Sequence, residues 1–140
     1  MGRVLSIDYG QKRTGLAVTD PLQLIANGLA TVPTASLLDF LAEYTSREKV
    51  ERIIVGLPRQ TTGEESENMS RIRPFTERLR KRFPDIPVEF SDERFTSVMA
   101  HRAMLEGGLR KKARQNKALV DEISATIILQ GWMETHRYGQ

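Results

Sequence analysis

Apolar residues fall into short strand-like runs in the first part of the chain. These runs are rich in β-branched and aliphatic residues, and they span residues 4–8, 14–19 and 24–32. Turn residues separate them, because Gly10 follows the first run and Asp20 and Pro21 end the second. The pattern predicts three antiparallel strands in series, with the third interrupted at Asn27 and Gly28.

Helical stripes alternate with short apolar runs in the remainder of the chain. Ser36 can cap a helix whose apolar residues recur at helical spacing as far as Tyr44. Thr96 or Ser97 should begin another helix, and Pro74 predicts a kink or a restart within its own helix. The other expected elements are strands at 50–55 and 87–91 and helices at about 69–83 and 117–135.

This order of elements predicts one α/β domain over residues 1–140. Three hairpin-connected strands precede two further strands that alternate with helices. The sheet should therefore be mixed, with helices flanking it. We find no internal repeat, linker or low-complexity segment in the chain.

The composition excludes several classes of protein. The chain has 140 residues and no cysteine, which excludes disulfides, zinc fingers, iron–sulfur ligation and thiol chemistry. No apolar run approaches the roughly 20 residues of a membrane span. Residues 1–5 lead directly into the first strand, without the pattern of a signal peptide. We therefore expect a cytoplasmic protein that does not bind membranes.

Basic residues are concentrated in two segments. The net charge is +3 and the pI is near 9.4, a balance that permits nucleic-acid binding without requiring it. We interpret the segment 71–82 as a solvated helix face. The segment 110–117 follows Gly107 and Gly108 and contains no acid, so it suits a solvated surface and phosphate contacts equally well.

Three acidic positions lie in or beside apolar runs: Asp8, Asp121, and the pair Asp92 and Glu93. A buried carboxylate costs roughly several kcal/mol unless a cation or hydrogen-bond donors accompany it. Acids that come together repel one another unless a divalent metal holds them, and oxygen ligands favour Mg²⁺ or Mn²⁺. Each acid also has an ordinary interpretation, as a turn residue, a helix cap or a helix-dipole acid. The local pattern leaves Asp92 and Glu93 as equal candidates.

Periodicity indicates where two of these acids point. On the first strand, Asp8 shares a face with Val4 and Ser6. Gly10 and Gly15 should keep the hairpin low and leave room for a substrate backbone above it. In the last helix, residues 119, 120, 123 and 127 form the main apolar stripe, and residues 121, 125, 128 and 132 form a second face. We expect both faces of this helix to be packed.

Four ordered segments together resemble the YqgF family of bacterial RNase H-like nucleases, also called RuvX and grouped with Holliday-junction resolvases. They are residues 6–10 with 14–18, 53–58, 92–97 and 120–125. The resemblance covers nearly the whole chain. It implies an RNase H-like fold and a metal-dependent endonuclease that matures the 5′ end of the 16S rRNA precursor.

The resemblance also implies the site. Asp8, Glu93 and Asp121 would ligate Mg²⁺ or Mn²⁺, which selects Glu93 by analogy. We assign Asp8 as the bridging ligand because of its place on the central strand, with Glu93 and Asp121 flanking it. Such metals activate water and stabilise the leaving oxygen. Related resolvases usually carry a further acid one helical turn after the last aspartate, where this chain has Ser124.

The loop that follows residues 56–58 departs from the family pattern. Gln60 and Thr62 stand where many members have asparagine and aspartate. This difference concerns contacts of the loop with substrate and leaves the acid set unchanged.

Basic residues near the motifs are candidates for phosphate contact, which would make binding depend on salt. They are Lys12, Arg94, Lys111, Lys112 and Lys117. Tyr9 and Phe95 could stack on bases, but core packing suits both better. Structured RNA is the favoured partner and branched DNA the alternative, bound by a monomer or a weak dimer.

Three other functions share parts of this pattern. A non-cleaving nucleic-acid-binding factor in transcription or ribosome assembly is the main alternative, because the fourth acid is missing. A resolvase of DNA junctions would need a symmetric dimer, and no apolar stripe is clearly reserved for one. Actin-like ATPases need two such domains and a second glycine-rich phosphate loop, which 140 residues do not provide.

Overall fold

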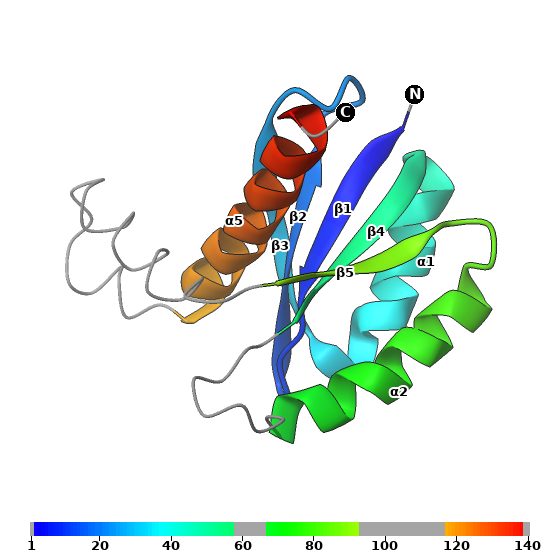
Figure 1. The fold of residues 1–140 in the computed structure, drawn as a ribbon. Coiled ribbons are helices and arrows are strands. Elements are labelled where there is room, and N and C mark those ends of the chain that lie inside the picture. The colour runs from blue at the N-terminus through cyan, green and yellow to red at the C-terminus, as the bar shows by residue number, and fades with distance from the viewer. Residues whose placement is uncertain (1, 58–66, 93–116, 139–140) are drawn as a thin grey trace.

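The computed structural model describes residues 2–57, 67–92 and 117–138, and Figure 1 shows how they are arranged. The elements in chain order are β1 (Arg3–Asp8), β2 (Arg13–Thr19), β3 (Ala26–Pro33), the 3-10 helix η1 (Thr34–Ser36), α1 (Leu37–Arg47), β4 (Val50–Leu57), α2 (Glu67–Arg82), β5 (Val88–Asp92) and α5 (Lys117–Tyr138). The expected helix from Thr96 or Ser97, and the residues Gln60 and Thr62, lie outside the described residues. No helix in this part of the chain combines the length and apolar character that a membrane crossing needs.

The five strands form one mixed sheet in the order β3-β2-β1-β4-β5. β1 pairs antiparallel with β2, and β2 pairs antiparallel with β3, whereas β1 with β4 and β4 with β5 are parallel pairs. The predicted fold class, a mixed sheet with three antiparallel strands and two further strands between helices, is confirmed. Helices α1 and α2 cover one face of the sheet, and α5 covers the other (Figure 1).

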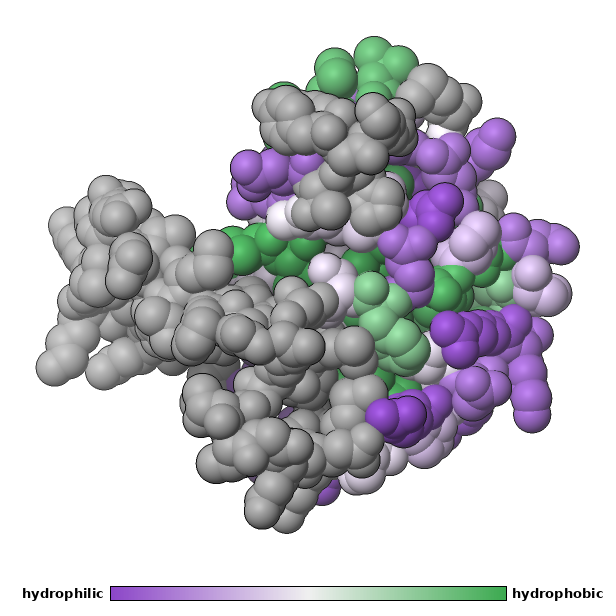
Figure 2. Space-filling model, viewed as in Figure 1, coloured by the Kyte–Doolittle hydropathy of each residue, from purple (hydrophilic) through white to green (hydrophobic). Residues whose placement is uncertain are grey.

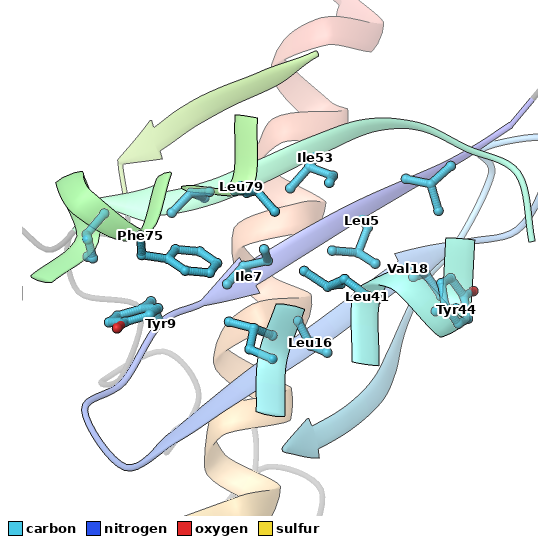
Figure 3. Close-up of a cluster of buried hydrophobic side chains, with 14 residues drawn as sticks. Leu5, Ile7, Tyr9, Leu16, Val18, Leu41, Tyr44, Ile53, Phe75 and Leu79 are labelled. Atoms are coloured by element: carbon cyan, nitrogen blue, oxygen red, sulfur yellow. The ribbon is translucent and has the colours of Figure 1, made fainter. Parts of the chain in front are cut away.

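The larger core lies between the sheet and the helices α1 and α2 (Figure 3). Alternate residues of β1 point into it, and among them Leu5 and Ile7 are fully buried. Tyr9 belongs to the same core, and its ring lies 4.8 Å from that of Phe75. Tyr9 is therefore a core residue, as its sequence context favoured, and a burial of this kind stabilises by about 1.5–3 kcal/mol for each large side chain.

The smaller core joins α5 to the opposite face of the sheet. Its fully buried members include Val4 and Ile54 from the sheet and Leu129 from α5. The prediction that residues 119, 120, 123 and 127 form the main buried stripe of the last helix was wrong, because Ile123 and Ile127 are only half-buried. The second face packs on the sheet instead, since small side chains such as Ala17 and Ala125 let the helix approach closely.

Two local helix signals behave differently from expectation. Of the kink or restart expected at Pro74, the restart does not occur, because α2 runs through this residue as one helix. The buried side chains of Ile72 and Phe75 on either side hold the helix on the sheet, which offsets the cost of about 3 kcal/mol for an internal proline. Ser36 does occupy the position before α1, but its side chain makes no capping hydrogen bond.

The third strand begins later than expected, at Ala26. The carboxylate of Asp20 accepts hydrogen bonds from the backbone N–H groups of Leu24 and Ile25, at 2.7 and 2.8 Å, and so keeps both residues in the preceding loop. The bond from Ile25 is also the main reason that the pKa of Asp20 lies below its usual value. Leu22, Leu24 and Ile25 are exposed, and Figure 2 shows an apolar group at the top of the view, where Figure 1 places this loop.

Asn27 and Gly28 do not interrupt the third strand. Both are paired with β2, and the irregularity is a register shift opposite Leu16 and Ala17. A single extra residue in one strand is enough to produce such a shift. The strand therefore accommodates these turn-forming residues without ending.

Replacing Gly131 by alanine should stabilise the protein. A Cβ atom at this exposed position of α5 would meet nothing within 4 Å, and glycine inside a helix is less favourable than alanine by about 0.5–1 kcal/mol. The urea midpoint should rise at an unchanged m-value. Gln130→Ala at the neighbouring exposed position is the control, with a smaller rise. A lower midpoint for Gly131→Ala would contradict the packing described for α5.

Candidate functional site

The carboxyl ends of the three parallel strands meet at one edge of the sheet. β1 ends at Asp8, β4 at Leu57 and β5 at Asp92, and the last two residues are paired in register. Ligands of α/β sheets commonly bind outside the carboxyl ends of the strands. This edge, at which β1 also turns into β2, is the candidate functional site.

Asp8 lies on the face of β1 that α5 covers. Ser6, two residues earlier, donates a hydrogen bond from its Oγ to the carbonyl of Ala125 in α5, at 2.6 Å, and Val4 packs in the same smaller core. Leu5 and Ile7 pack in the opposite core. The predicted face of Asp8 is confirmed, and its side chain is half-buried at the end of the strand.

Gly15 brings the second acid to this position. It is paired with Asp8 in the antiparallel register of β1 and β2. A Cβ atom on Gly15 would lie 2.2 Å from the carbonyl oxygen of Asp121 and 3.0 Å from its Cβ. The backbone of α5 at Asp121 therefore rests directly on Gly15, beside Asp8, and two acids far apart in the sequence flank one glycine.

The prediction that Gly10 and Gly15 leave room for a substrate backbone above the hairpin was wrong. The room that Gly15 leaves is filled by the backbone of Asp121 and so is closed to a substrate backbone at that point. Gly10 serves the hairpin itself, because a Cβ atom there would lie 2.2 Å from the carbonyl oxygen of Arg13.

Arg13 is the cation that the structure places beside Asp121. Its Nε donates to Oδ2 of Asp121 at 3.0 Å, and the side chains are 39% and 26% exposed. Arg13 is the first residue of β2 and is paired with Pro33 of β3. The apolar pattern begins the second strand at residue 14, one residue after Arg13, and Lys12 is the cation of this turn that the sequence indicates as a phosphate ligand. The sequence feature that could have indicated this role of Arg13 is its spacing of two residues from Gly15, which places both on the same face of the strand.

Two threonines hold the turn between β1 and β2, residues 9–12, which we call the braced turn. Thr34 donates from its Oγ1 to the carbonyl of Gly10 at 2.7 Å and from its backbone N–H to the carbonyl of Lys12 at 3.0 Å. The hydroxyls of Thr34 and buried Thr14 lie 2.9 Å apart. The turn next to Asp8 is thus tied to the start of η1, an arrangement that no motif in the sequence had indicated.

The other predicted site residues have different outcomes. Lys12 is exposed on the braced turn. Lys117 opens α5, and its side chain lies outside what the structure describes. Glu93, Arg94, Lys111 and Lys112 lie outside the described residues altogether. Within residues 2–57, 67–92 and 117–138 there is no group of three acidic or histidine side chains that could hold a metal, so the structure brings together Asp8 and Asp121 of the predicted set.

Ser124 occupies the position one helical turn after Asp121. Its side chain is 3% exposed and lies on the buried side of α5 together with Ala125. This chain therefore presents a buried hydroxyl group at the position where related resolvases were expected to carry an acid.

A sequence model of the RuvX family, described as a Holliday junction resolvase, matches residues 2–135. The chain belongs to the RuvX family. The match includes all three segments that contain the candidate acids, so Asp8, Glu93 and Asp121 all lie inside the RuvX region.

Relatives of this RuvX-family chain extend over its whole length. A protein of Phocaeicola vulgatus is 69% identical over 138 residues, which cover 99% of each chain. A protein of Bacteroides fragilis is 66% identical over 137 residues, covering 98% of this chain and 99% of the relative. Both relatives are assigned as pre-16S rRNA nucleases.

Two solved structures of RuvC from Thermus thermophilus have the same fold. One, in complex with a Holliday junction substrate, is 18% identical with a TM-score of 0.60, covering 99% of this RuvX-family chain and 97% of RuvC. The other is 18% identical with a TM-score of 0.59, covering 98% and 96%. This likeness shows the RNase H-like fold.

Proposed function

We propose that this RuvX-family chain is a metal-dependent endonuclease that hydrolyses phosphodiester bonds of structured RNA, and that it matures the 5′ end of the 16S rRNA precursor in the cytoplasm. One observation carries the proposal: in a chain of this family, Asp8 and Asp121 flank Gly15 at the carboxyl edge of the parallel strands. The relatives assigned as pre-16S rRNA nucleases support the choice of substrate.

The donor set fits a hard divalent cation. Asp8 and Asp121 supply carboxylate oxygens, the ligands that Mg²⁺ and Mn²⁺ prefer. The guanidinium of Arg13 lies 3.0 Å from Oδ2 of Asp121, so the position beside this acid already accommodates positive charge. We propose Asp8, Glu93 and Asp121 as the ligands. A bound metal of this kind activates water near neutral pH and stabilises the leaving oxygen.

The chain itself orients these groups. Asp8 projects from the end of a central strand whose neighbours on both sides are paired. Asp121 is held by the backbone contact of α5 with Gly15 and by Arg13. Both acids are therefore positioned before substrate arrives, which lowers the entropic cost of reaching the reactive geometry.

Basic residues would bind the phosphates of the RNA. We propose Lys12, Arg94, Lys111, Lys112 and Lys117 for this role, acting in a monomer or a weak dimer. Lys12 is exposed on the braced turn next to Asp8, which supports its inclusion. Their shared signature would be an affinity that falls as the salt concentration rises.

The test is cleavage of an end-labelled fragment that contains the 5′ precursor sequence of 16S rRNA. The native chain should cut this RNA with Mn²⁺ or Mg²⁺ and should leave it intact in EDTA. A four-way DNA junction of similar mass serves as the comparison, because the family is described as a Holliday junction resolvase. Cutting of the junction alone would favour the resolvase function. Binding of the RNA without any cleavage would favour a non-cleaving factor in ribosome assembly.

A further inference from the structure

We infer that Arg13 binds a phosphate group of the nucleic acid while it holds the carboxylate of Asp121. This inference rests on the proposed function, because it assumes that a nucleic-acid strand reaches the acids. It adds one phosphate-binding residue, Arg13, to the basic residues that the sequence had suggested.

The hydrogen bonding of Arg13 leaves most of its donors available. Its guanidinium has five N–H groups, and the bond from Nε to Asp121 uses one of them. Among the described residues, the terminal amino groups of Arg13 make no hydrogen bond. With 39% of the side chain exposed, these groups can bind an anion. A guanidinium also binds phosphate through two parallel hydrogen bonds, which a lysine cannot provide.

The position of Arg13 in the sheet directs it to the acids. Successive residues of a strand alternate between faces, so Arg13 shares a face with Gly15, the glycine paired with Asp8 and covered by Asp121. Lys12 precedes the strand and makes no ion pair within the described part of the chain. Of these two neighbouring cations, Arg13 is the one fixed at the carboxylates.

The ion pair by itself contributes little stability. A pair as exposed as Arg13 and Asp121 is worth about 0–1 kcal/mol. Stabilisation of α5 comes instead from the apolar contacts of its buried face. The pair therefore serves to orient the guanidinium of Arg13 next to the acids. The backbone of Arg13 is itself held in place, because β2 is paired with β3 and follows the braced turn.

The test measures binding of the labelled precursor RNA in EDTA, so it does not depend on cleavage. Arg13→Gln should weaken binding about tenfold, since a hydrogen bond to a charged group is lost. The slope of log affinity against log salt should become shallower by about 0.7–0.9, the value for one phosphate contact. Arg47→Gln is the matched control: it removes the same charge and an ion pair with Glu43 on α1, and it should leave both quantities unchanged.

A second background separates phosphate binding from support of Asp121. In Asp121→Asn protein the acid is uncharged, and Arg13→Gln should still weaken binding about tenfold if Arg13 contacts phosphate directly. If Arg13 acts only by neutralising Asp121, its substitution will have no effect in this background, and the inference is overturned. Arg13→Lys should restore the salt slope and only part of the affinity.

The two proposals fail in different ways. Native affinity and salt slope in Arg13→Gln would overturn the role of Arg13 while leaving the nuclease intact. If the native chain binds the RNA but does not cleave it, and Arg13→Gln still weakens binding, only the nuclease proposal would be overturned. A native chain that shows no salt-dependent binding of the RNA would overturn the role of Arg13.

Discussion

Asp8→Asn should abolish cleavage, lowering the rate of the native chain about a thousandfold or more. The substitution keeps the size of the side chain but removes the charge from one of the three acids that we propose as metal ligands. Loss of a metal ligand removes several kcal/mol of transition-state stabilisation, and about 4 kcal/mol corresponds to a thousandfold change in rate. The measurement is single-turnover cleavage of the labelled precursor RNA with Mn²⁺.

The control for this prediction is Asp39→Asn. Asp39 lies on α1, on the opposite face of the sheet, with a side chain 86% exposed, so its variant should cut at the native rate. Both variants should melt within a few degrees of the native chain in EDTA, which separates loss of chemistry from loss of fold. Titration with Mn²⁺, followed by its paramagnetic resonance, should show weaker binding only for Asp8→Asn. Near-native cleavage by Asp8→Asn would contradict the proposed site.

Gly15→Ala should damage both the fold and the activity. Its Cβ atom would lie 2.2 Å from the carbonyl oxygen of Asp121 and 2.4 Å from the carbonyl carbon, so α5 has to move away from the sheet. Overpacking of this kind costs about 1–3 kcal/mol. The shift also carries Asp121 away from Asp8, and a displacement of about 1 Å can cost about a hundredfold in rate. We expect a lower urea midpoint and cleavage reduced about a hundredfold.

Gly28→Ala provides the matched comparison for Gly15→Ala. Gly28 also lies under α5, but a Cβ atom there would be 3.5 Å from the Cβ of Glu122, an ordinary contact. This variant should keep native cleavage and change stability by less than about 1 kcal/mol. The only tryptophan of the chain, Trp132, lies on α5 and donates a hydrogen bond to Glu89 of β5. Its fluorescence should therefore change in Gly15→Ala and stay native in Gly28→Ala. Native fluorescence and native cleavage in Gly15→Ala would contradict the contact of α5 with Gly15.

Elements whose signals are local were well predicted. Alternation along residues 4–8 correctly placed Asp8 on the face opposite to Leu5 and Ile7, because the period of a strand depends only on its own backbone. Errors arose where a side-chain contact overrode the backbone pattern. The carboxylate of Asp20 holds Leu24 and Ile25, which were expected to begin β3, in the preceding loop. Packing of the residues around Pro74 on the sheet kept α2 in one piece.

The candidate site shows the same division. Asp8 and Asp121 were recognised from their acidic side chains in apolar settings, and the resemblance to the RuvX family grouped them with Glu93. Glu93 stays a prediction, because it lies outside the described residues. The ion pair of Arg13 with Asp121 and the threonine brace of the turn were not foreseen, because each joins segments that share no local pattern.

The amino-acid order alone was thus enough for the strand and helix types, the face of Asp8 and the family, because these depend on periodicity and on short motifs. The packed chain was needed to show that α5 rests on Gly15 and that Arg13 meets Asp121. Periodicity states which side chains share a face, but it contains no information about which distant segment will cover that face. That choice follows from shape, since the missing side chain of Gly15 opposite Asp8 is what admits the backbone of Asp121.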